Sequence, residues 1–133
     1  MQQLSTYLYV GLGSALGGMA RHWTTGLVAS RWGTAFPWGT LAVNVAGSLV
    51  IGVLAAWLVP GGRWLLPFPA RELLIVGVLG GYTTFSAFSL QTFMLLEQGN
   101  WLRAGGNVLL SVVLCLAAVS LGYLLATSVV RAG

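Results

Sequence analysis

Charged side chains are scarce in this sequence, and their scarcity decides the class of protein. Only 6% of the 133 residues are charged, whereas an ordinary soluble domain has about 25%. Lysine and aspartate are absent, so six arginines and two glutamates supply all the charge, and 57% of the residues are hydrophobic. A 14.0 kDa globule cannot cover a water-exposed surface with so few charges. The composition therefore excludes a soluble enzyme and a disordered tail, and it predicts an all-α integral membrane protein.

Cysteine and histidine are equally rare, which limits the chemistry that the chain can carry. Cys115 is the single cysteine and cannot form an internal disulfide, and His22 is the single histidine. The sequence contains no Ser-His-Asp, Cys-His or metal-ligand spacing, so it predicts no enzyme. The arginines stand singly and form no basic patch, so we expect no nucleic-acid partner. Residues 1–20 contain no charge, whereas a signal peptide begins with positive charge, so we expect no cleaved signal.

Four stretches of the chain are free of charge, and each is long enough to cross a bilayer once, which takes about 20 apolar residues. Proline, glycine and asparagine separate these stretches and favour short turns. We expect four transmembrane helices in a single transmembrane domain, residues 1–133. The expected helices are residues 4–29, 38–59, 70–98 and 101–130.

The arginines are balanced across the expected membrane. Four crossings place both ends of the chain on one side, with three arginines on that side and three on the other, or two on the other if Arg21 lies within the first helix. Arginine bias in short loops sets the direction of insertion, so this balance predicts insertion in both orientations and an antiparallel, dual-topology homodimer. The alternative is a weakly biased protein that something else orients. The two groups are Arg63, Arg71 and Arg131 on the terminal side, and Arg21, Arg31 and Arg103 on the other.

Small residues recur at a spacing of four in three of the expected helices. This spacing places small side chains on one helix face and lets two backbones approach closely. We therefore expect dense helix packing. The three pairs are Gly13 and Gly17, Ser48 and Gly52, and Gly77 and Gly81.

Residues 80–84 of the third expected helix combine two glycines with three residues of modest helix propensity. One interpretation is a helix broken near its middle, whose freed carbonyl oxygens can coordinate a cation. The other interpretation is an intact helix with a glycine packing notch. The residues alone leave both open.

Polar side chains at membrane depth are costly, so they are functional candidates. Two stripes recur at helical spacing, and residues 83–92 add several hydroxyl groups around two phenylalanines. Amide and hydroxyl groups donate hydrogen bonds, and phenyl edges carry partial positive charge, so such a lining suits an anion. Ordinary core packing remains the alternative for the phenylalanines. The two stripes are Thr40, Asn44 and Ser48, and Asn107, Ser111 and Cys115.

Three motifs resemble the Fluc/CrcB family of fluoride channels. Residues 39–48 (GTLAVNVAGS) are similar to its second-helix motif, residues 80–89 (GGYTTFSAFS) to its third-helix signature, and residues 17–21 (GGMAR) to its first-helix pattern. The length and the four-span layout also agree. The resemblance therefore covers nearly the whole chain.

The resemblance implies an antiparallel dimer with two fluoride pores and a structural Na⁺ at its centre. It also implies roles for particular residues. The implied fluoride pore is Asn44, Phe85, Phe88, Ser86, Ser89, Thr92 and Ser111, with Arg21 in a vestibule and the backbone carbonyls of Gly80 and Thr83 on Na⁺.

The implied function is passive export of fluoride from the cytoplasm across a prokaryotic inner membrane, which relieves fluoride toxicity. The partners are fluoride, the lipid bilayer and a second copy of the chain. One alternative is a small multidrug-type, proton-coupled exporter, although no carboxylate lies within the expected spans. Another is a non-transporting membrane scaffold, in which the polar stripes would only join helices.

Overall fold

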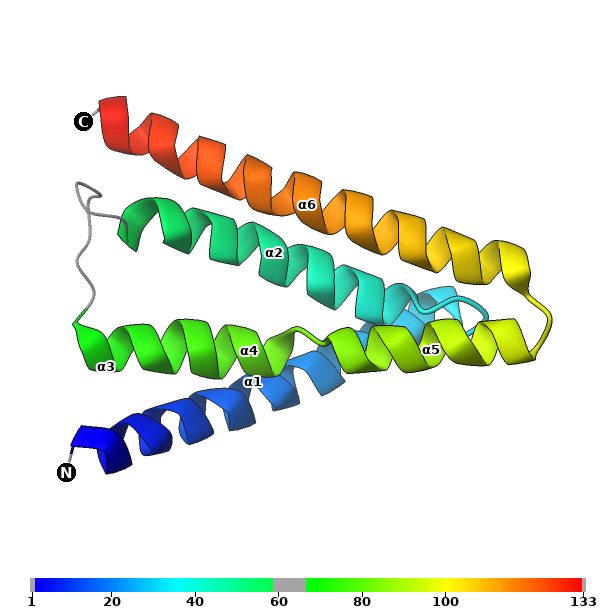
Figure 1. Ribbon diagram of the computed structural model, residues 1–133, viewed down its shortest axis with the longest axis horizontal. Helices are drawn as coiled ribbons and strands as arrows, with labels where there is room; N and C mark the ends of the chain where they lie inside the picture. The colour runs from blue at the N-terminus through cyan, green and yellow to red at the C-terminus, as the bar shows by residue number, and fades with distance from the viewer. Residues whose placement is uncertain (1, 59–66, 133) are drawn as a thin grey trace.

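A computed structural model describes residues 2–58 and 67–132, and within these ranges the chain is helical with no strand. The expected helix end at residue 59 and Arg63 lie outside the described residues. In Figure 1 the first turn of α1 and the last turn of α6 lie at the same end of the molecule. The long helices are α1 (Gln2–Trp32), α2 (Trp38–Leu58) and α6 (Trp101–Ala132), and the third helical region comprises α3 (Phe68–Arg71), η1 (Glu72–Leu79), α4 (Gly80–Tyr82) and α5 (Phe85–Glu97).

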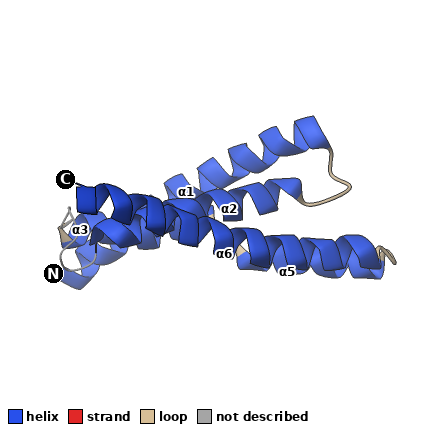
Figure 2. Cartoon of the chain, turned by 90° about the horizontal axis from the view of Figure 1, so that it is seen from above, coloured by secondary structure: helices blue, strands red, loops and turns tan. Residues whose placement is uncertain are grey.

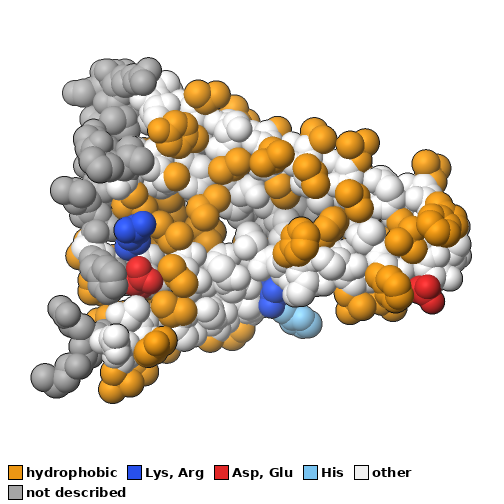
Figure 3. All heavy atoms as spheres, viewed as in Figure 1, with side chains coloured by type: hydrophobic (Ala, Val, Ile, Leu, Met, Phe, Trp, Pro, Cys, Tyr) orange, Lys and Arg blue, Asp and Glu red, His pale blue; other side chains and the backbone are white. Residues whose placement is uncertain are grey.

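Three helical stretches among the described residues are long and apolar enough to cross a membrane. They are Trp38–Leu58, Pro69–Glu97 and Trp101–Val129. The 31-residue helix α1 is not one of them, because Arg21, His22 and several hydroxyl and glycine residues reduce its apolar character. Figure 3 shows apolar side chains over much of one face and few charged groups.

Two glycines in the left-handed conformation end helices at the same end of the molecule. Gly33, with φ +75°, follows α1, and Gly99, with φ +72°, follows α5. Glycine adopts this conformation without steric cost, which is why it commonly terminates helices. Helix α1 ends three residues later than expected, so Arg31 lies in its last turn.

The third helical region is interrupted at two threonines, which decides between the two interpretations of residues 80–84. Thr83 and Thr84 have extended backbones, with ψ of 155° and 115°. The break is narrower than expected, because Gly80 and Gly81 remain helical in α4. A Cβ atom on Gly81 would lie 2.8 Å from the Cα of Ser14, so this glycine serves the contact with α1 instead.

Glycines bring helix backbones into direct contact at two interfaces. Helix α1 packs on η1 and α4, where a Cβ on Gly13 would lie 2.8 Å from the Cα of Gly77. Helix α2 packs on α6, where a Cβ on Gly52 would overlap the carbonyl of Val119, and one on Gly122 would overlap the carbonyl of Leu49. The expected close packing at Gly13, Gly17, Gly52, Gly77 and Gly81 is confirmed.

The helices diverge at the end that carries the α1–α2 loop. Figure 2 shows that α1 and α2 separate there from α5 and α6, so the molecule forks. Glu72–Leu79 forms a π-helix, which leads from α3 into α4 and the break. Wider π turns are rare and commonly accompany functional sites.

Candidate functional site

The interruption at Thr84 is held by the side chain of Asn44 in α2. The Asn44 Nδ2 group donates to the Thr84 carbonyl at 3.0 Å, and Asn44 Oδ1 accepts from the Thr84 N–H at 2.8 Å. A buried extended residue inside a helix loses its helical partners, and an unpaired backbone group is costly. Asn44 Oδ1 therefore replaces the helical acceptor that the Thr84 N–H has lost, and its amide adds a donor to the Thr84 carbonyl, at which α5 begins.

Further contacts fix the two threonines. The Thr84 hydroxyl accepts from the Ala87 N–H at 3.2 Å and so caps α5. The Thr83 hydroxyl donates to the Leu79 carbonyl at 3.0 Å. A Cβ on Gly47 would overlap the Cγ2 methyl of Thr83, so the absence of a side chain at Gly47 makes room for this threonine.

Two backbone carbonyls near the break lack their helical hydrogen-bond donors, because the corresponding N–H groups bond to side chains. In an uninterrupted α-helix the N–H of residue i bonds to the carbonyl of residue i−4. The N–H groups four residues after Gly80 and Thr83 belong to Thr84 and Ala87, and both bond to side-chain oxygens instead. The carbonyls freed in this way belong to the two residues that the resemblance assigned to Na⁺.

Two cavities lie on either side of the break, and Thr84 lines both. The second cavity, about 520 Å³, has no charged residue in its lining. It brings together six of the pore and Na⁺ residues that the resemblance implied. These are Asn44, Gly80, Thr83, Phe85, Phe88 and Ser111.

The two phenylalanines at this cavity are in contact but differ in burial. Their ring centroids lie 5.2 Å apart with a 48° angle between the planes. Phe88 is 8% exposed, whereas Phe85 is 78% exposed in the single chain. Phe88 is therefore part of the core, and Phe85 presents most of its ring outside the subunit.

Three hydroxyls that the resemblance placed in the pore line neither cavity, those of Ser86, Ser89 and Thr92. Each of them has a partner within its own subunit. The Ser89 hydroxyl donates to the Phe85 carbonyl at 2.9 Å, and the Thr92 hydroxyl donates to the Phe88 carbonyl at 2.8 Å. Each hydroxyl has one proton, so Ser89 and Thr92 both donate theirs to a backbone carbonyl of α5. The Ser86 hydroxyl lies 3.3 Å from the Thr84 hydroxyl.

Thr92 also joins two helices through Asn107, which the sequence placed in a polar stripe but not in the implied pore. The Asn107 Nδ2 group of α6 donates to the Thr92 hydroxyl at 2.8 Å, and Asn107 is only 2% exposed. The sequence contained a signal for the pair of Asn107 and Thr92, because a buried asparagine in an apolar segment must find a hydrogen-bond partner.

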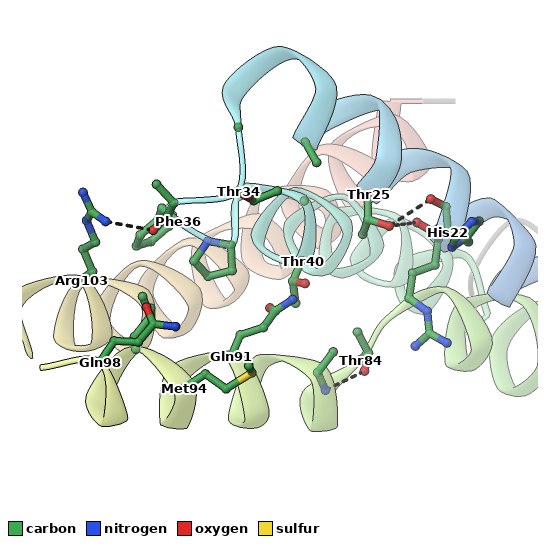
Figure 4. Close-up of a pocket in the computed structure, with 18 of the residues that line it drawn as sticks. His22, Thr25, Thr34, Phe36, Thr40, Thr84, Gln91, Met94, Gln98 and Arg103 are labelled. Atoms are coloured by element: carbon green, nitrogen blue, oxygen red, sulfur yellow. Dashed lines mark hydrogen bonds between the residues drawn. The ribbon is translucent and has the colours of Figure 1, made fainter. Parts of the chain in front are cut away.

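The first cavity, about 540 Å³, lies within the fork and is shown in Figure 4. Arg21, which the resemblance placed in a vestibule, lines it together with His22 and Arg103, and no carboxylate of the described residues does. Gln91 also lines this cavity, and its buried Oε1 atom has no hydrogen-bond partner among the described residues. The sequence assigned no role to Gln91 or Arg103.

Residues 8–123 match the family model described as CrcB-like protein, Camphor Resistance (CrcB). The chain belongs to the CrcB family. The resemblance found in the sequence is therefore confirmed, and with its apolar helices the protein is a multi-pass membrane protein.

Curated members of the CrcB family similar to this chain carry the name fluoride-specific ion channel FluC. The protein from Opitutus terrae is 55% identical over 92% of this chain and 93% of its own length. Those from Methylocella silvestris and Rhodospirillum rubrum are 50% and 52% identical. These alignments cover 92% and 89% of this chain, and 94% and 92% of the relatives.

Proposed function

We propose that this protein is a fluoride-selective channel that lets fluoride leave the cytoplasm passively across a prokaryotic inner membrane. One observation carries the proposal: the second cavity combines an amide, two phenyl rings and a buried hydroxyl in a lining without charge. Such a lining replaces part of the hydration shell of an anion without trapping it by a full positive charge. The names of the relatives support fluoride as that anion.

Asn44 retains a hydrogen-bond donor for fluoride while it holds the break. The amide nitrogen carries two protons, and the Thr84 carbonyl accepts one of them. The second proton, the Ser111 hydroxyl and the ring edges of Phe85 and Phe88 would contact the ion. Ser86, Ser89 and Thr92 would extend the path once their hydroxyls turn from their present partners.

The channel would be an antiparallel, dual-topology homodimer with two pores. In each subunit α1 would be the fourth membrane crossing. The balanced arginines support insertion in both directions. The exposed ring of Phe85, beside the cavity that it lines, supports a second copy as the missing wall. A single subunit leaves this wall open.

A Na⁺ at the dimer centre would be held by the carbonyl oxygens of Gly80 and Thr83 from each subunit. The freed carbonyls described above fit this ion, because Na⁺ prefers oxygen ligands and an interrupted helix provides them. The ion supplies positive charge at the subunit interface when bound. The chain's own part is to hold the two carbonyls away from helical hydrogen bonds.

Arg21 would raise the local concentration of anions in the first cavity, from which fluoride enters. No bond is made or broken, so the protein would act as a channel and not as an enzyme. A negative membrane potential of 100 mV favours exit of an anion by about 2.3 kcal/mol. Fluoride that enters as its neutral acid and dissociates inside would thus be released, which relieves its toxicity.

Efflux from liposomes tests the proposal against its two alternatives. Vesicles loaded with potassium fluoride and containing only this protein should release fluoride when valinomycin carries the counter-charge, whereas vesicles loaded with potassium chloride should retain chloride. Proton-coupled drug exchange without fluoride efflux would favour the multidrug-type exporter. The absence of both would favour the scaffold.

A further inference from the structure

Arg103 reaches from the start of α6 to the loop that joins α1 and α2. Its Nη1 group donates to the carbonyl of Ala35 at 3.3 Å. Every residue of this loop, 33–37, lines the first cavity, and so does Arg103. Figure 4 shows the Arg103 guanidinium at the loop, across the cavity from His22.

The position of Arg103 is unfavourable for the helix that carries it. Arg103 lies in the first turn of α6, where the helix dipole is positive and repels a cation. A backbone carbonyl nearby offsets part of this repulsion. Among the described residues, the Ala35 carbonyl is the hydrogen-bond partner of this guanidinium.

One hydrogen bond leaves most of the guanidinium uncommitted. Arginine has five N–H donors, and Nη1 of Arg103 uses one on Ala35. No aspartate or glutamate lines the cavity, while Arg21 lines it from α1. Two positive charges from different helices therefore act on the same open cavity, where charge of one sign raises the local concentration of anions.

We propose that Arg103 is the second anion-attracting residue of the first cavity, and that the Ala35 carbonyl positions its charge at the rim. This inference rests on the proposed function, because it specifies which residues load the cavity with a small monovalent anion. Arg103 acts on the ion through its field before the ion reaches the break. The competing explanation is that Arg103 only fastens the loop.

Three variants separate the charge of Arg103 from its hydrogen bond. Arg103→Lys retains the charge and a donor, and Arg103→Gln retains a donor without the charge. Arg31→Gln is the matched control, because Arg31 is an exposed arginine in the last turn of α1 that does not line the cavity. Thermal unfolding and size-exclusion profiles show whether each variant keeps its fold.

The measurement is fluoride efflux from liposomes at subsaturating fluoride and constant pH, at low and at high ionic strength. We expect Arg103→Gln to slow efflux at low ionic strength by about twofold to tenfold. The difference from wild type should shrink at high ionic strength, because salt screens the charge. Arg103→Lys and Arg31→Gln should behave like the wild type.

Two results would overturn the inference while leaving the proposed function intact. One is wild-type efflux from Arg103→Gln at low ionic strength. The other is an equal loss in Arg103→Gln and Arg103→Lys that salt does not change, which would make the loop contact the sole role. A wild-type protein that releases no fluoride would overturn the proposed function itself, and this inference with it.

Discussion

The side chain of Asn44 pairs with the backbone of Thr84 in both directions, donating to its carbonyl at 3.0 Å and accepting from its N–H at 2.8 Å. The two residues are 40 positions apart in the chain. The interruption of the third helical region is therefore specified by α2 as well as by the third region's own sequence. The same amide would hold the break and meet the ion, which makes its substitution informative.

Asn44→Asp should abolish fluoride efflux and destabilise the fold. A carboxylate cannot donate to the Thr84 carbonyl and brings a second acceptor against it, so the lost hydrogen bond and the repulsion should cost about 1–3 kcal/mol. The negative charge would also repel the anion. Efflux assays and thermal unfolding measure the two effects, with Asn100→Asp in the turn before α6 as the control. Normal efflux from Asn44→Asp would remove Asn44 from the pathway.

Phe85→Ile and Phe88→Ile should each reduce fluoride efflux, because isoleucine lacks the positive ring edge that faces an anion. Phe88→Ile should also lower stability, since Phe88 is 8% exposed, by about 1 kcal/mol. Phe93→Ile is the control, because Phe93 lies on the same helix, is 57% exposed and lines neither cavity. Unchanged efflux in both test variants would exclude the phenyl rings from the pathway.

Gly47→Ala should displace Thr83 and lower stability by about 1–3 kcal/mol, the usual cost of an overfilled core. The new methyl group would overlap Thr83 Cγ2. Thr83→Ser removes that atom and retains the hydroxyl, so the double variant should recover stability and efflux.

The control for this pair is Gly11→Ala, because no atom lies within 4 Å of a Cβ at Gly11 and Gly11 lines neither cavity. A double-mutant cycle gives the coupling between the two sites directly. Additive losses in Gly47→Ala and Thr83→Ser would mean that α2 does not shape the break through this contact.

Removal of Na⁺ should lower both efflux and dimer stability if the carbonyls of Gly80 and Thr83 hold the ion. Proteoliposomes and detergent-solubilised protein are exchanged into N-methylglucamine buffer, and readdition of Na⁺ should restore both properties. As the control, N-methylglucamine chloride is added in place of Na⁺ at the same ionic strength, and it should restore neither property. Full efflux and unchanged thermal unfolding after exhaustive exchange would contradict the cation site.

The helical class could be predicted from the charge-free stretches, whereas the poor helix formers at residues 80–84 left an interrupted and an intact third helix equally open. The position of the break within this segment could not be predicted. Gly80 and Gly81 are the weaker helix formers, but Gly81 contacts Ser14 of α1 and stays helical. The partner that stabilises Thr84 comes from another helix, and local propensity carries no information about it.

Part of the candidate site could also be predicted from the sequence, whereas the contacts between helices could not. Spacing identified Asn44, Phe85 and Phe88, because polar and aromatic residues stand out in an apolar segment. It did not reveal that the protons of Ser89 and Thr92 go to carbonyls one turn away. Nor could it bring Arg103 to Ala35, because such contacts depend on how the helices cross.

The glycine contacts have a mechanical consequence. Where backbones touch, as at Gly13 with Gly77 and at Gly52 with Val119, no side chain stands between two helices to change rotamer and absorb a shift. Helix α1 with the segment before the break, and α2 with α6, should each move as a rigid block. Any rocking of one block on the other would then change the packing of α1 against α2 and stretch or relax the two bonds between Asn44 and Thr84.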